Sequence, residues 1–124
     1  QAELPGAYAR AGVVLNDHWA DMRAGGFVSN RLFDAVACGA RVLSDDLPGV
    51  DLDALFAGSV RTVAPDDVVA VRTLLADVGS SWPDDRTRAA TAARVREEHS
   101  FDARAEALLG LAEEIRQRRR TVTP

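Results

Sequence analysis

The stretch SNRLFDAVACGARVLS, residues 29–44, decides how this chain folds. Its first residue, Ser29, is of a type that caps helix N-termini. Apolar side chains then recur at helical spacing and form one stripe: Leu32, Phe33, Val36 and Ala37. Gly39 has the position of the glycine that follows a helix C-cap, and the apolar run at 41–44 begins immediately after it. The stretch therefore predicts a helix that leads directly into a buried strand.

Two further runs have the composition of strands. Residues 12–16 are nearly continuously apolar, as are residues 41–44, which is the pattern of parallel strands covered on both faces. Residues 59–63 alternate and indicate a more exposed strand. Helical segments separate the three runs. We therefore predict an α/β fold: a parallel-sheet, Rossmann-like half domain of about three strands, with helices on both faces and a long C-terminal helix.

The helices after the second strand are marked by caps and apolar spacing. A short helix is expected at 52–56, and another opens at 65–67 with acidic residues in its first turn and ends near Gly79. Its predicted buried stripe consists of Val68, Val71, Leu74 and Leu75. Two more helices are expected at about 85–98 and 101–118, with Ser100 as the cap between them.

We interpret residues 1–124 as a single domain that is half of a larger fold. A chain of 124 residues has room for one domain. Three parallel strands make a poor sheet, because doubly wound sheets usually have more strands and an uncovered edge invites association. The chain begins at Gln1, without an initiating Met. We expect either strands upstream of this segment or a homo-oligomer in which another chain covers the edge.

Composition excludes several classes of function. The net charge of −4 argues against nucleic acid as a partner, since duplex binding requires a basic face. The one dense basic run, at 116–120, is typical of a solvated helix end, with an anionic membrane surface as the alternative. All 15 basic residues are arginine, which excludes lysine Schiff-base chemistry and a GxxxxGK[ST] phosphate loop.

Cysteine use and hydropathy narrow the setting further. Cys38 is the only cysteine, so an internal disulfide and a multi-cysteine zinc site are excluded. No stretch approaches the ~18 apolar residues of a membrane span, and no signal-peptide pattern is present. We therefore expect no integral membrane segment and a cytoplasmic setting.

The segment 16–49 carries the candidate chemistry. It combines a strand, a glycine-containing loop, a capped helix and a second strand. In open α/β sheets, ligands bind in the crevice beyond the carboxyl ends of the strands, and free amides at a helix N-terminus bind phosphate. Gly25 and Gly26 permit close backbone approach, while Arg23 and Arg31 supply positive charge.

This segment resembles the donor site of glycosyltransferases with the two-domain GT-B fold, and most closely the group 1 glycosyltransferase-like proteins that include the spore-maturation type. The similarity rests on RLFDAVACG at 31–39, VLSD at 42–45 and Pro48-Gly49, and it continues through LDALF at 52–56 to EHSFDARA at 98–105. The resemblance implies that the chain is the C-terminal, nucleotide-sugar-binding half of such an enzyme. It also implies that catalysis requires a missing N-terminal, acceptor-binding domain, with no metal ion or other cofactor.

The resemblance also implies roles for individual residues. Asp34 matches a helix carboxylate that hydrogen-bonds the ribose hydroxyls of the donor. The amides around Val28, Ser29 and Asn30 match the point where the diphosphate rests on the helix N-terminus, and Arg31 lies just past them. Taken by itself, the sequence favours an Asp34 that only pairs with Arg31 or Asn30 on an exposed helix face.

The sequence departs from the family pattern in the loop before this helix. Many relatives carry a second acid eight positions before the helix carboxylate, where it holds the transferred sugar, and here that position is Gly26. The spacing from Phe27 to Asp34 is one residue longer than in the commonest form. This departure supports the alternative function, a non-catalytic protein-interaction module derived from a degenerate glycosyltransferase half.

His18 is a further candidate for contact with the donor or the acceptor. A hydrogen bond that stabilises its own loop is the alternative, and a metal site formed with Asp17 and Asp21 is a third interpretation. Trp19 and Trp82 are each candidates either for stacking on a sugar or base, or for half-buried packing.

Overall fold

The computed structural model describes residues 3–122, with side chains through residue 119. One three-stranded parallel sheet forms the centre, in the order β1-β2-β3. The strands are β1 (Val14–Asn16), β2 (Val42–Asp45) and β3 (Val60–Val63). Val14 lies opposite Val42, which lies opposite Val60. The predicted parallel half sheet is therefore confirmed, and its carboxyl ends meet at one edge.

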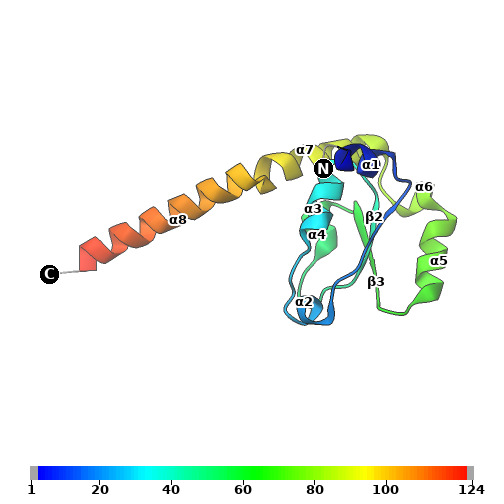
Figure 1. Cartoon of the computed structure of the whole chain (residues 1–124), viewed down its shortest axis with the longest axis horizontal. Helices are drawn as coiled ribbons and strands as arrows, with labels where there is room; N and C mark the ends of the chain where they lie inside the picture. Colours follow the sequence, from blue (N-terminus) through cyan, green and yellow to red (C-terminus); the bar gives the residue numbers. More distant parts are fainter. Residues whose placement is uncertain (1–2, 123–124) are drawn as a thin grey trace.

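Helices lie on both sides of this sheet. Figure 1 shows the strands between α3 and α4 on one side and α5 on the other. Helix α7 packs along α3, and α1 also contacts α3. The helices are α1 (Leu4–Arg10), α2 (Ala20–Ala24), α3 (Asn30–Ala37), α4 (Leu52–Phe56), α5 (Val68–Ala76), α6 (Val78–Ser81), α7 (Asp85–His99) and α8 (Phe101–Val122). The arrangement is that of a Rossmann-like half domain with a long C-terminal helix.

Helix α3 begins and ends where the sequence predicts. The Ser29 side chain accepts a hydrogen bond from the Arg31 amide at 3.3 Å, and Gly39 adopts φ +77°, a left-handed conformation that glycine takes without strain. The helix face that meets the sheet consists of Leu32, Ala35 and Val36, all buried. Phe33, which the sequence places in the same stripe, is only partly buried.

The core lies between the sheet and this helical layer. Its largest fully buried apolar side chains are Phe56, Leu32, Val36, Val42 and Val60. The buried Trp82 indole donates its Nε1–H to the Val42 carbonyl at 3.1 Å. Trp82 therefore has a packing role, whereas Trp19 is 79% exposed.

The expected burial of α5 is wrong. This helix contains no buried residue, and Val68 and Leu75 of its predicted stripe are exposed. A helix buries its apolar face only where another layer lies against it, and a three-stranded sheet gives α5 little to cover. The expected helix at 65–79 is also divided, because the Asp77 side chain accepts the Ser80 amide and caps a separate short helix, α6.

Candidate functional site

A buried histidine ties the loop after β1 to the end of β2. The His18 side chain is fully buried, and its Nδ1 lies 2.6 Å from Oδ1 of Asp45. On the other side of the ring, Nε2 lies 3.3 Å from the backbone nitrogen of Ser29. An amide N–H donates, so Nε2 is the acceptor and Nδ1 carries the proton that it donates to Asp45. Both ring nitrogens are thus engaged within the protein.

The remaining contacts of Asp45 hold its carboxylate in place. The Ser44 hydroxyl donates to Oδ1 at 3.2 Å, and the His18 backbone amide donates to Oδ2 at 3.3 Å. Arg23 of α2 lies 4.0 Å from Oδ2, donates from Nε to the Asp46 carbonyl at 3.0 Å, and forms an ion pair with the Asp46 carboxylate. This network fixes α2 and the N-terminus of α3 against the carboxyl end of β2.

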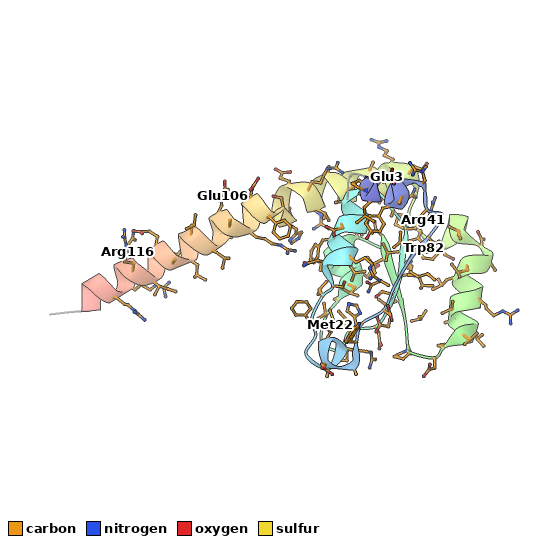
Figure 2. The ribbon with its side chains drawn as sticks, viewed as in Figure 1. Glu3, Met22, Arg41, Trp82, Glu106 and Arg116 are labelled. Atoms are coloured by element: carbon orange, nitrogen blue, oxygen red, sulfur yellow. The ribbon has the colours of Figure 1, made fainter. Side chains whose placement is uncertain are left out.

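A cavity of about 540 Å³ lies at the carboxyl ends of the three strands. It is lined by residues that follow each strand, including Asn16, His18, Asp45 and Asp66, and by Val71 of α5. Figure 2 shows Met22 of α2 at this end of the body, whereas Arg41 and Trp82 lie toward the opposite end. His18 therefore lies at the predicted crevice, but its side chain is buried and supports the wall of the cavity from within the protein.

Asp34 lies in a separate groove between α3 and the junction of α7 and α8. This groove has a volume of about 480 Å³ and is lined from α3 by Asn30, Phe33, Asp34 and Ala37. The α7–α8 junction contributes Arg96, His99, Ser100, Phe101 and Arg104. The structure therefore brings Asp34 and Asn30 together in one hollow and separates them from His18, which lines the other cavity.

The Asp34 carboxylate is exposed and forms no hydrogen bond or ion pair within the part of the chain that the structure describes. The pairing with Arg31 or Asn30 that the sequence allows is thus not made. The wall beside it is aromatic and cationic: the Phe33 ring packs edge-on against Phe56 at 5.1 Å, and the Arg104 guanidinium lies 4.4 Å from the Phe33 centroid. The groove thus combines a carboxylate without a partner, an aromatic surface and positive charge.

The negative charge of Asp34 affects the pKa of Cys38, the C-cap residue of α3. Burial raises the pKa of the Cys38 thiol, and the Asp34 carboxylate raises it further, while Arg96 acts in the opposite direction. Cys38 is therefore held as a thiol at neutral pH, which agrees with a packing residue rather than a nucleophile.

The N-terminus of α3 retains backbone amides without acceptors. The Ser29 amide is occupied by His18, and the Arg31 amide by the Ser29 hydroxyl. Among the residues that the structure describes, the amides of Val28 and Asn30 form no hydrogen bond. This end of α3 is therefore able to accept an anion at two positions.

The loop before α3 is fixed by backbone conformation. Gly26 has φ +62°, and a Cβ at this position would lie 3.5 Å from the Pro48 carbonyl oxygen and from Val50 Cγ2. Any other residue here would adopt a strained left-handed conformation. The next residue, Phe27, is 59% exposed and donates its amide to the Met22 carbonyl at 2.8 Å.

A family model described as glycosyl transferase-like matches residues 1–110. The chain belongs to this family. The match spans the sheet, both hollows and the first half of α8 of the glycosyltransferase-like domain. No curated protein and no solved structure matches the chain.

Two further findings concern metal binding and membrane-spanning helices. Between residues 3 and 122, no group of three or more histidine, cysteine or acidic side chains is arranged to hold a metal ion. Asp17 and Asp21 therefore do not converge with His18 on a cation. None of the helices described over the same range is long and apolar enough to cross a membrane.

Sequence reasoning missed two parts of the site. It gave no role to Asp45, the partner of His18, although an acid at the end of a buried strand is placed at the carboxyl edge of the sheet. It also missed the contribution of Phe101 and Arg104 to the Asp34 groove. Both residues lie in the family-like stretch at 98–105, but that stretch does not indicate contact with Asp34, because the contact depends on how α8 leaves α7.

Proposed function

We propose that this glycosyltransferase-like domain binds a nucleoside-diphosphate sugar as the donor half of a two-domain, GT-B-type transferase. The observation that carries the proposal is the exposed Asp34 carboxylate, without a partner in the described chain, beside the open amides of α3. Asp34 accepts hydrogen bonds from the ribose hydroxyls. The diphosphate rests on the open amides of Val28 and Asn30, with the Arg31 side chain beside them.

The chemistry of the groove supports this assignment. Carboxylates recognise vicinal hydroxyls as bidentate acceptors, and helix N-terminal amides bind phosphate oxygens without a positive side chain. Arg31 is exposed one residue into α3, so it adds a charge-assisted contact to the diphosphate. A volume of about 480 Å³ lies within the usual range for small-molecule sites.

In this proposal, His18 and Ser29 act differently from Asp34. His18 holds the Ser29 amide and so sets the position of the first turn of α3. Gly26 and Phe27 shape the loop that the transferred sugar approaches. The acceptor, and with it catalysis, is assigned to a second domain outside these residues.

Nucleotide binding by the Asp34→Ala variant tests the proposal. Loss of a charge-assisted hydrogen bond costs roughly 1.5–3 kcal/mol, so the variant should bind UDP, GDP or dTDP about tenfold more weakly or worse. Glu97→Ala is the matched control, because Glu97 is an exposed acid on α7 outside the groove. Calorimetric titration should give wild-type affinity for the control.

The second candidate is a protein-interaction module, and the glycine at position 26 favours it because no acid is present there to hold a sugar. The same nucleotide titration distinguishes the two functions. A donor-binding domain is stabilised by at least one nucleotide in proportion to its occupancy. Absence of binding to all three nucleotides would favour the interaction module.

A further inference from the structure

Two contacts fix the direction of the Asp34 groove along α3. Arg96 of α7 donates a hydrogen bond to the Ala37 carbonyl in the last turn of α3. His99, one turn later in α7, places its ring centroid 5.2 Å from that of Phe33, one turn earlier in α3. The two helices are therefore antiparallel here, and Figure 1 shows α7 beside α3 before α8 leaves the body. Arg96 marks the end of the groove near Ala37, and His99 lies toward the other end.

The proposed donor site orients a nucleotide along this groove. Its diphosphate lies at the N-terminus of α3, and its ribose lies at Asp34, about 6 Å along the helix axis from Asn30. The base continues in the same direction and reaches Ala37, about 4.5 Å beyond Asp34. Ala37 and the buried Val95 give the groove an apolar wall there, against which the flat face of a base packs. The base therefore lies within reach of the Arg96 guanidinium.

The Arg96 guanidinium retains open donors at this end of the groove. One of its nitrogens donates to the Ala37 carbonyl, and within the described chain the others form no hydrogen bond or ion pair. A guanidinium carries five N–H donors and no acceptor. Arg104, also in the groove, lies over the Phe33 ring and so toward the opposite end. The base consequently meets a side chain that offers donors alone.

A side chain with donors alone discriminates between two kinds of base. The atom of the base farthest from the ribose belongs to the substituent on C4 of a pyrimidine or C6 of a purine. In uracil, thymine and guanine this substituent is a carbonyl oxygen, which accepts a hydrogen bond from the guanidinium. In cytosine and adenine it is an amino group, so two donors face each other and neither is satisfied. An amino group here is therefore rejected more strongly than a missing contact.

We propose that Arg96 selects a keto base, so that the donor nucleotide of this domain carries uracil, thymine or guanine rather than cytosine or adenine. This selectivity rests on the proposed function, because the ribose contact of Asp34 decides which end of the groove receives the base. Asp34 holds the ribose of every ribonucleotide alike, whereas Arg96 distinguishes their bases. Arg96 thus has two roles, since it also donates to the last turn of α3.

UDP and CDP test this selection because they share ribose and diphosphate. They differ in the carbonyl or amino group on C4 and in the protonation of N3 that accompanies it. Calorimetric titration of the 124-residue chain should give a Kd about tenfold lower for UDP than for CDP. This is the low end for a hydrogen bond with a charged group, because Arg96 is exposed. GDP and ADP form the matching purine pair and should differ in the same direction.

Arg96→Gln separates base selection from a role in capping α3. The glutamine amide offers both a donor and an acceptor, so the Kd values for UDP and CDP should come within about twofold of each other. Arg86→Gln is the matched control and should keep the tenfold ratio, because Arg86 is an exposed arginine of α7 outside the groove. Circular dichroism establishes that both variants retain their helix content. An Arg96 that only caps α3 would leave the ratio unchanged in Arg96→Gln, and that result would overturn the selection.

The same titrations distinguish failure of the selection from failure of the donor site. Asp34→Ala should weaken UDP and CDP binding by the same factor, because both nucleotides carry the same ribose. Binding that depends on Asp34, but is equal for UDP and CDP, would uphold the donor site and overturn the selection by Arg96. Absence of binding by all four nucleotides would overturn both.

Discussion

His18 is the residue whose removal should most weaken the end of the sheet. His18→Ala deletes the 2.6 Å hydrogen bond to Asp45 and the acceptor of the Ser29 amide. The first bond has a charged partner and costs roughly 1.5–3 kcal/mol, and the second costs about 1 kcal/mol. The side chain is fully buried, so water does not replace these partners without entering the protein. We expect a total destabilisation of about 2–4 kcal/mol.

Urea unfolding followed by circular dichroism measures this loss. The midpoint should fall without a change in slope, and the melting temperature should drop by roughly 8–16 °C for a domain of this size. Protein concentration is held constant, because any self-association contributes to apparent stability. Asp17→Ala is the control, since the neighbouring Asp17 is exposed and forms no hydrogen bond or ion pair within the described chain.

His18→Asn separates the two contacts. Its amide nitrogen takes the approximate place of Nδ1 and keeps the bond to Asp45, whereas the acceptor for Ser29 is lost. This variant should therefore lose about 1 kcal/mol, well short of the loss in His18→Ala. The reasoning is refuted if His18→Ala unfolds within about 0.5 kcal/mol of wild type, the range of ordinary surface substitutions.

Two ionisable groups give the remaining predictions. The alkylation rate of Cys38 should rise with pH around a midpoint above the ordinary thiol pKa, because burial and the Asp34 carboxylate raise the pKa of this thiol. Asp34→Asn should lower that midpoint, and an unchanged midpoint would show that Asp34 does not act on Cys38. The Asp84 carboxylate caps α7 by accepting the Thr87 amide, which lowers its pKa. Its contribution to stability is therefore complete above about pH 4 and is lost as the pH falls through the lowered pKa. Asp84→Ser keeps a cap that does not titrate, so its urea midpoint should fall less than that of wild type on acidification, and equal falls would count against the cap.

The structure of α3 could be predicted from sequence because its signals are local. The Ser29 cap, the apolar spacing and Gly39 all lie within a dozen residues, and each acts on the backbone beside it. The three strands are predictable for the same reason. Their short length, their β-branched residues and the caps on the segments between them distinguish these apolar runs from buried helices.

The features that the sequence did not predict correctly depend on contacts between residues far apart in the chain. Burial of α5 depends on a layer that its own spacing does not describe, so Val68 has the right periodicity and yet remains exposed. His18 and Asp45 are 27 residues apart and meet because parallel pairing brings the ends of β1 and β2 together. The groove around Asp34 requires α7 to pack along α3 before α8 leaves it. The sequence therefore identified Asp34 as a candidate, but it did not predict which residues surround it.

Residue-resolved NMR during a nucleotide titration tests donor binding most directly. The backbone amide signals of the ¹⁵N-labelled chain are followed while UDP, GDP and dTDP are added in turn. The account predicts that one nucleotide shifts the amides of Asn30, Arg31 and Asp34, that signals around Val71 stay in place, and that Asp34→Ala weakens the response. Shifts confined to the cavity at the strand ends, or no shift with any nucleotide, would contradict it.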